Sequence, residues 1–113
     1  MKLIISGGRD YQFSAEDRAF LDSLQDITEV VSGGAAGADA QGEEWARIRQ
    51  IPVMVFQADW KAHGRGAGPR RNRAMAEYAD AVALFPGGRG SASMRREAEK
   101  RGLKFFFSTQ VSH

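Results

Sequence analysis

Cysteine is absent from this chain of 113 residues, and histidine occurs only at His63 and His113. Without cysteine the protein can form neither a disulfide nor a thiolate zinc site, and it has no cysteine nucleophile. Two histidines are too few for a histidine-rich metal site. We therefore expect neither a metal nor a separate cofactor.

Long apolar segments are also missing at the N-terminus, where Leu3, Ile4 and Ile5 are followed directly by Ser6 and Gly7. Such a run is far too short for a signal-peptide core or a membrane span. The sequence therefore predicts a cytoplasmic protein with no membrane partner. A chain of this length has room for one hydrophobic core, so residues 1–113 are expected to form a single domain.

Glycine, by contrast, is concentrated at three places. The glycine-rich segments 6–10, 32–39 and 86–91 each follow a short apolar run and lead into a segment with helical character. A strand, a glycine loop and a helix in that order can build an anion site. The reason is that unpaired N–H groups and the positive dipole end at the helix start both point at the ligand. Three such segments in a small domain favour a phosphate-bearing ligand.

Apolar runs predict strands at residues 2–6, 29–32, 53–56, 81–85 and 103–107. Four helices are predicted: one capped by Ser14 with Asp17 as capping-box partner, one with an apolar stripe over 38–46, one from Pro69 to about residue 79, and one over about 91–101 that ends at Gly102. Residues 57–68 show neither the periodic apolar spacing of a helix nor the alternation of a strand. They therefore predict a long loop, with one helical turn near 59–62.

Alternating strands and helices predict an α/β fold. Right-handed crossovers favour a Rossmann-like three-layer sandwich with a five-stranded, mainly parallel sheet. If the strand order is 3-2-1-4-5, the order reverses between strands one and four, and ligands of open α/β sheets bind at that point. The loops at residues 7–8 and 87–88 would then lie side by side, with 33–34 next to them.

Residues 31–39, 68–73 and 85–90, in that order, resemble the YspA-like (cpYpsA-related) members of the SLOG superfamily. This superfamily also contains the Lonely-Guy phosphoribohydrolases, the molybdenum-cofactor carrier proteins and the core of the DNA-processing protein A family. The resemblance implies a Rossmann-like fold that holds a nucleotide or a related phosphate ligand. It also implies a homo-oligomer, with which the aromatic run 105–107 is consistent.

The resemblance to the phosphoribohydrolases is uneven. Their Pro-Gly-Gly-x-Gly-Thr-x-x-Glu signature is matched by Pro86, Gly87, Gly88, Gly90 and, in place of threonine, Ser91. Their arginine matches Arg71, but the lysine that follows it is Asn72 and the glutamate is Met94. Cleavage of a glycosidic bond calls for carboxylates near an oxocarbenium-like centre. Asp10, Asp39, Glu43 or Glu97 would have to replace the missing glutamate.

These observations predict one group of ligand-binding residues at the loops and at the start of the Pro69 helix: Gly7, Gly8, Arg9, Gly33, Gly34, Asp39, Arg71, Asn72, Pro86, Gly87, Gly88, Gly90 and Ser91. Asp39 would either cap its helix or hold a ribose hydroxyl. Trp60 and His63 fall in the long loop. There an aromatic residue would stack on a base as part of a lid, or it would plug the core while the histidine stays in solvent.

Three functions are compatible with this pattern. The leading hypothesis is a protein that binds a nucleotide or nucleotide-derived ligand as a sensor, carrier or sequestering protein. The alternative is an enzyme that hydrolyses the N-glycosidic bond of nucleoside 5′-monophosphates. Single-stranded nucleic acid is the least favoured partner. Such sites interleave aromatic and basic residues, and here Trp60 alone lies near the basic second half of the chain.

Overall fold

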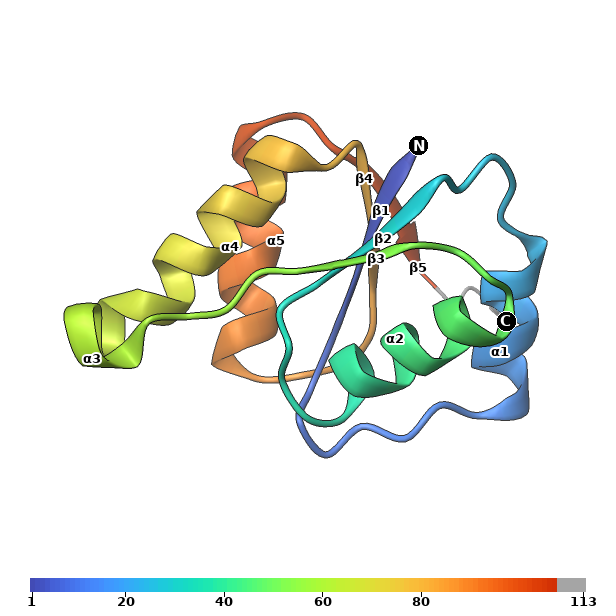
Figure 1. Ribbon diagram of the computed structural model, residues 1–113, viewed down its shortest axis with the longest axis horizontal. Helices are drawn as coiled ribbons and strands as arrows, with labels where there is room; N and C mark the ends of the chain where they lie inside the picture. Colours follow the sequence, from blue (N-terminus) through green and yellow to red (C-terminus); the bar gives the residue numbers. More distant parts are fainter. Residues whose placement is uncertain (108–113) are drawn as a thin grey trace.

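Five parallel strands form one sheet at the centre of the protein (Figure 1). The computed structural model describes residues 1–107, so residues 108–113 of the expected domain, with His113, lie outside the described part. The strands are β1 (Lys2–Ser6), β2 (Glu29–Ser32), β3 (Val53–Val55), β4 (Ala81–Leu84) and β5 (Lys104–Phe107). Their order is β3-β2-β1-β4-β5. The predicted α/β class and strand order are confirmed, and every pair of neighbouring strands is parallel.

The middle of the sheet is covered on both faces, which explains why its strands are continuous apolar runs. Ile4 of β1 lies opposite Val31 of β2 on one side and Val82 of β4 on the other. All three side chains are fully buried. This packing fixes the register of the strands whose carboxyl ends carry the glycine loops.

Helices form the two outer layers. They are α1 (Ala15–Ser23), α2 (Ala38–Ile48), α3 (Trp60–His63), α4 (Ala67–Tyr78) and α5 (Arg89–Lys100), with a 3₁₀ turn η1 (Gly64–Gly66) between α3 and α4. In Figure 1, α1 and α2 lie on one side of the sheet and α4 and α5 on the other. Leu3 accordingly belongs to a core cluster with Leu21 and Trp45, whereas Ile4 belongs to a cluster with Met75 and Met94. Successive strand residues thus serve opposite layers.

The capping box predicted for the first helix is confirmed. The Ser14 hydroxyl accepts a hydrogen bond from the Asp17 backbone N–H at 3.0 Å, and the Ser14 N–H donates to the Asp17 carboxylate at 3.0 Å. Two of the N–H groups at the helix start are therefore satisfied by side chains. The end of α1 lies at Ser23, and Leu24 has an extended backbone.

The segment 57–68, predicted as a loop, contains more helix than expected. After α3 the chain continues through η1 directly into α4, which begins at Ala67, two residues before Pro69. Proline is tolerated there because it lies in the first helical turn, whose N–H groups have no acceptor within the helix. The sequence did not predict this helical segment because it contains glycines at 64, 66 and 68, and glycine is a poor helix former.

The last helix also begins early, at Arg89 rather than near Ser91, because the Gly88 carbonyl already accepts from the Ala92 N–H at 3.1 Å. The strand ends and the end of α4 lie within a residue of those predicted, and α2 continues two residues beyond the predicted stripe, to Ile48. Gly102 follows α5 with a φ of +67°, the left-handed conformation that favours glycine after a helix.

The aromatic run of β5 divides between the two layers. Phe105 packs against the α4/α5 cluster and Phe106 against the α1/α2 cluster, while Phe107 is 38% exposed. The expected homo-oligomer stays a prediction. Within residues 1–107 no helix combines the length and apolar character that crossing a bilayer requires.

Candidate functional site

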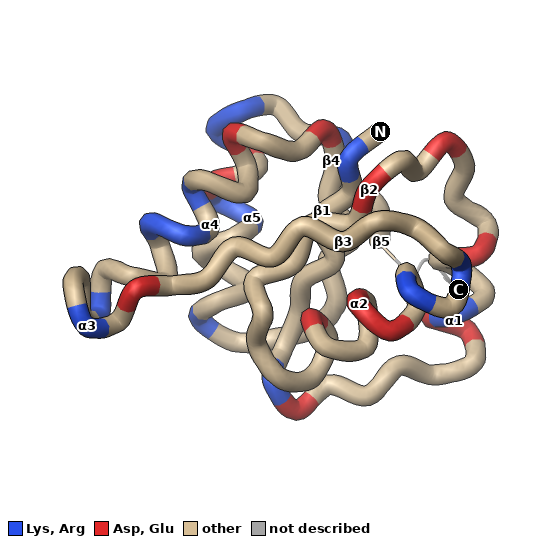
Figure 2. Tube along the Cα trace, in the orientation of Figure 1, with Lys and Arg blue, Asp and Glu red and all other residues tan. Residues whose placement is uncertain are grey.

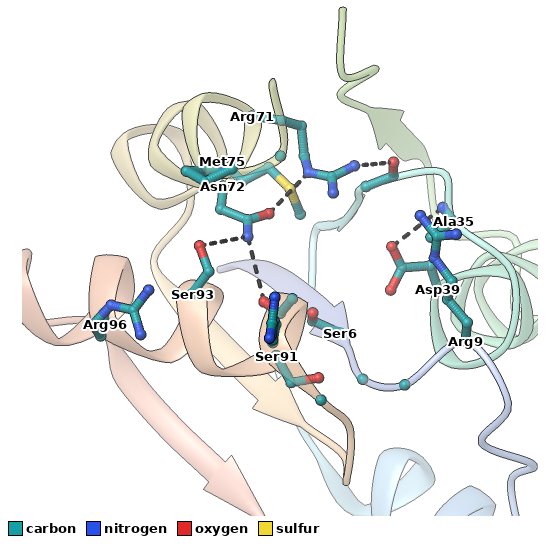
Figure 3. A pocket seen from close by; sticks show the side chains of 18 of the residues that line it. Ser6, Arg9, Ala35, Asp39, Arg71, Asn72, Met75, Ser91, Ser93 and Arg96 are labelled. Carbon is teal, nitrogen blue, oxygen red and sulfur yellow. Dashed lines mark hydrogen bonds between the residues drawn. The ribbon is translucent and has the colours of Figure 1, made fainter. Parts of the chain in front are cut away.

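A pocket of about 530 Å³ lies where the loops after β1, β2 and β4 meet the start of α4 (Figure 3). Most of the residues predicted to bind ligand line it: Gly7, Gly8, Arg9, Gly33, Asp39, Arg71, Asn72, Gly88, Gly90 and Ser91. Gly34, Pro86 and Gly87 do not. Pro86 and Gly87 instead line a neighbouring hollow of about 350 Å³, which shares Gly88 and Ser91 with the pocket.

Backbone contacts hold the first and last loops together. The Gly8 N–H donates to the Pro86 carbonyl at 2.8 Å, and the Gly8 carbonyl accepts from the Ala38 N–H at 3.1 Å. Gly37, the residue before α2, has a φ of +72°, and a Cβ there would stand 2.3 Å from the Gly8 and Arg9 carbonyl oxygens. This glycine is therefore required by the close approach of two backbones.

The start of α5 is open towards the pocket. Its N-cap, Gly88, has no side chain, and its first turn contains no acidic residue. The hydroxyl of Ser91 in that turn is buried and has no hydrogen-bond partner among residues 1–107. A helix start with unused N–H groups and a free hydroxyl favours an anion. A Cβ on Gly90 would meet nothing within 4 Å, so packing does not explain that glycine.

Arg71 and Asn72 connect the walls of the pocket from α4 (Figure 3). Arg71 donates from Nη1 to the Gly33 carbonyl at 2.5 Å and from Nε to the Asn72 amide oxygen at 2.8 Å. Asn72 in turn donates to the Ser93 hydroxyl at 3.1 Å and the Gly90 carbonyl at 3.4 Å. The loop after β2, α4 and the first turns of α5 are thereby joined through one chain of polar contacts.

Asp39 is the only carboxylate among the residues that line the pocket, and it is buried. It lies in the first turn of α2 and accepts from the Ala35 N–H at 3.3 Å. Burial raises its pKa above the ordinary value of 3.8, although the Ala35 N–H and the Arg71 charge act in the opposite direction. Burial also lowers the pKa of Arg71, which the charge of Asp39 partly restores. Both charged forms are thus poorly solvated.

The pocket is strongly cationic. Its lining contains one acid, Asp39, and five arginines: Arg9, Arg65, Arg71, Arg89 and Arg96. None of these arginines forms a salt bridge with another residue in 1–107, whereas Arg47, Arg49, Arg73, Arg95 and Arg101 outside the pocket all do. Figure 2 shows basic positions along α3, α4 and α5, as well as others elsewhere on the chain.

The candidate replacements for the missing glutamate lie elsewhere, apart from Asp39. Met94 is fully buried in the core under α5. Glu43 accepts from the Ser32 hydroxyl at 2.6 Å, and Glu97 pairs with Arg101 at 3.0 Å. Neither Glu43, Glu97 nor Asp10 lines the pocket.

Several lining residues were not singled out from the sequence. Arg65, Arg89, Arg96 and Ser93 reach the pocket from η1 and α5. Arg89 directly follows a glycine pair, which was a usable signal, whereas Arg65 and Arg96 depend on where the helices pack. Trp60 also lines the pocket and is 52% exposed, so it does not plug the core. His63 is exposed and is not among the lining residues.

The parallel sheet and the pocket at its carboxyl edge define a Rossmann-like α/β protein. The sequence model of the YspA, cpYpsA-related SLOG family matches residues 1–63, and the chain belongs to this family. It is also 42% identical over 82 residues to the Gene 61 protein of Mycobacterium phage D29. That alignment spans 66% of this chain and 66% of the phage protein. No solved structure matches the chain significantly. The family indicates a nucleotide-related function.

Proposed function

We propose that this protein binds a nucleotide or nucleotide-derived ligand whose phosphate lies at the start of α5. The observation that carries this proposal is the Ser91 hydroxyl, which is buried beside the pocket with no partner among the described residues. Leaving a buried polar group unsatisfied costs about 1–3 kcal/mol. A phosphate oxygen would accept this hydrogen bond and remove the cost.

The surrounding backbone suits the same anion. At the start of α5 the N–H groups of Arg89, Gly90 and Ser91 have no acceptor within the helix, and the helix dipole adds a partial positive charge. Gly90 presents no side chain, so a phosphate can approach the backbone closely. Arg89, which forms no salt bridge within residues 1–107, supplies a full positive charge at the same end of the pocket.

The opposite wall suits the sugar. Asp39 has a carboxylate at the pocket surface, and such a group accepts hydrogen bonds from ribose hydroxyls. Arg71 is held to Gly33 and Asn72 through Nη1 and Nε, and its Nη2 makes no hydrogen bond among residues 1–107. This remaining nitrogen can donate to the ligand. The excess of arginine over acid favours an anion over a neutral nucleoside.

Binding is better supported than hydrolysis. The position of the family glutamate is Met94 in the core, and Asp39 is the single carboxylate of the pocket. We expect no free base when the protein is incubated with nucleoside 5′-monophosphates. The physiological role that follows is that of a sensor, carrier or sequestering protein.

Isothermal titration of the protein with AMP, ADP, NAD and ADP-ribose tests the proposal. At least one of these should bind and raise the melting temperature, whereas adenosine should do neither. Ser91→Ala should weaken binding about tenfold or more, since a hydrogen bond to a charged group contributes about 1.5–3 kcal/mol. Ser23→Ala, on the far side of the sheet in α1, is the matched control and should bind as the wild type does. Failure of all four ligands to bind would overturn the proposal.

A further inference from the structure

Trp60 is a large apolar side chain in the wall of a cationic pocket, and the core does not account for it. It is the first residue of α3, a single turn that Asp59 caps by accepting from the Ala62 N–H at 3.1 Å. Neither α3 nor η1 contains a buried residue. In Figure 1, α3 lies beyond the end of α4, away from the sheet. More than half of the tryptophan, 52%, is exposed.

The second tryptophan shows what a structural role looks like in this protein. Trp45 is 5% exposed, donates from Nε1 to Asp22 at 2.9 Å, and has the Arg49 guanidinium 5.4 Å from its ring centre. The backbone carbonyl of Trp60 accepts from the Gly64 N–H, but its indole has no hydrogen bond, no aromatic ring contact and no cation over the ring among residues 1–107. The edge of its indole reaches the first turn of α4, where a Cβ on Gly68 would stand 3.4 Å from Cη2.

The indole therefore has its edge against Gly68 and, among residues 1–107, neither an aromatic ring nor a cation over its faces. It lies in a pocket that also presents Arg65 and the open start of α5. Aromatic faces recognise planar rings, and stacking accepts any base because every base has a π-face. A sugar phosphate without a base would leave this surface exposed to water.

We propose that Trp60 is the stacking platform for the base of the bound ligand, so that the site selects nucleotides over other phosphorylated sugars. This inference rests on the proposed function and adds the residue that discriminates between ligands. The phosphate and the base then occupy separate parts of the pocket, the first at α5 and the second at α3.

Paired titrations with AMP and ribose 5-phosphate isolate the contribution of the base. Wild-type protein should bind AMP more tightly. Trp60→Ala should lower the affinity for AMP about tenfold, the effect typical of one stacked base, and leave ribose 5-phosphate unchanged. Trp60→Phe should retain most of the affinity for AMP. Ile48→Ala, which removes another exposed apolar side chain outside the pocket, is the control and should change neither value.

Indole fluorescence gives an independent readout, because the chain has only two tryptophans and Trp45 is buried. AMP, GMP, CMP and UMP should each quench the emission of the wild type, ribose 5-phosphate should not, and Trp60→Phe should abolish the quenching. If AMP binds equally well to wild type and Trp60→Ala, the stacking role is wrong although the nucleotide site stands. If neither AMP nor ribose 5-phosphate binds to the wild type, the proposed site itself fails and this inference fails with it.

Discussion

Helices α1 and α5 begin in opposite ways. At the start of α1, Ser14 and Asp17 exchange hydrogen bonds between side chain and backbone, and the Tyr11 hydroxyl donates to Asp17 at 2.7 Å. At the start of α5, Gly88 offers no side chain and the Ser91 hydroxyl has no partner within residues 1–107. One helix start is closed by its own residues and the other is left open.

The difference between the two helix starts shows that one serves folding stability and the other is available for binding. A closed start contributes to folding, because its N–H groups have protein acceptors. An open start forgoes that contribution, and the groups it leaves free are those that bind an anion. The start of α2 is intermediate, since the Gly8 carbonyl accepts from Ala38 and Asp39 supplies a carboxylate in the first turn. Of the three, α5 is the end that a phosphate can still use.

The largest effect on stability is expected for Gly87→Ala, which would break the loop that positions the open end. The added Cβ would stand 2.6 Å from the Gly8 backbone nitrogen and 2.1 Å from the Ser91 hydroxyl. The hydroxyl can rotate away, but the backbone of Gly8 must shift. Overpacking of this kind costs about 1–3 kcal/mol, and we expect about 2 kcal/mol of lost unfolding free energy in urea. Wild-type stability in this variant would show that the loop adapts freely.

Removing the two serine hydroxyls compares the helix starts directly. Ser14→Ala should lower the unfolding free energy by about 1 kcal/mol, the usual contribution of an N-cap. Ser91→Ala should cause no loss without ligand, because its hydroxyl has no partner among the described residues. Urea unfolding of both variants measures the difference. Equal losses would mean that Ser91 also has a structural role.

The sequence predicted the sheet and the closed helix start because both depend on local or repeated patterns. Buried strands are short apolar runs, and the Ser14 capping box spans four adjacent residues. The glycine loops were located for the same reason, and strand order then determined which loops meet. Arg65 and Arg96 were missed because their place in the pocket depends on how α4 and α5 pack. Trp60 lies in α3, which continues through η1 into α4. The sequence did not predict this continuation because the glycines at 64, 66 and 68 interrupt the helical pattern.

A smaller effect, with opposite signs for folding and binding, is expected for Gly90→Ala. The position is helical, and the added Cβ would meet nothing within 4 Å. Replacing glycine by alanine in a helix stabilises it by about 0.5–1 kcal/mol, and we expect about 0.5 kcal/mol in this first turn. The same methyl group would project where we place the phosphate, so AMP should bind more weakly. A variant that is more stable and binds AMP equally well would argue against an anion at this end.

The smallest effect concerns the pH dependence contributed by Asp39. Burial raises its pKa in the folded protein above the ordinary value of 3.8. The folded state therefore holds a proton that the unfolded state has released, so stability falls as the pH rises from about 3.8 through the folded-state pKa. Above that pKa the loss is complete and constant.

Asp39→Asn removes this titration while keeping an amide oxygen that can accept from Ala35. Unfolding free energies of wild type and variant should be compared at intervals between about pH 3 and pH 7, without ligand. The unfolding free energy of the variant relative to wild type should increase as the pH rises. A constant offset from altered hydrogen bonds does not change the slope of this difference with pH. A slope of the opposite sign would mean that attraction to Arg71 outweighs burial, and that the pocket already neutralises its carboxylate.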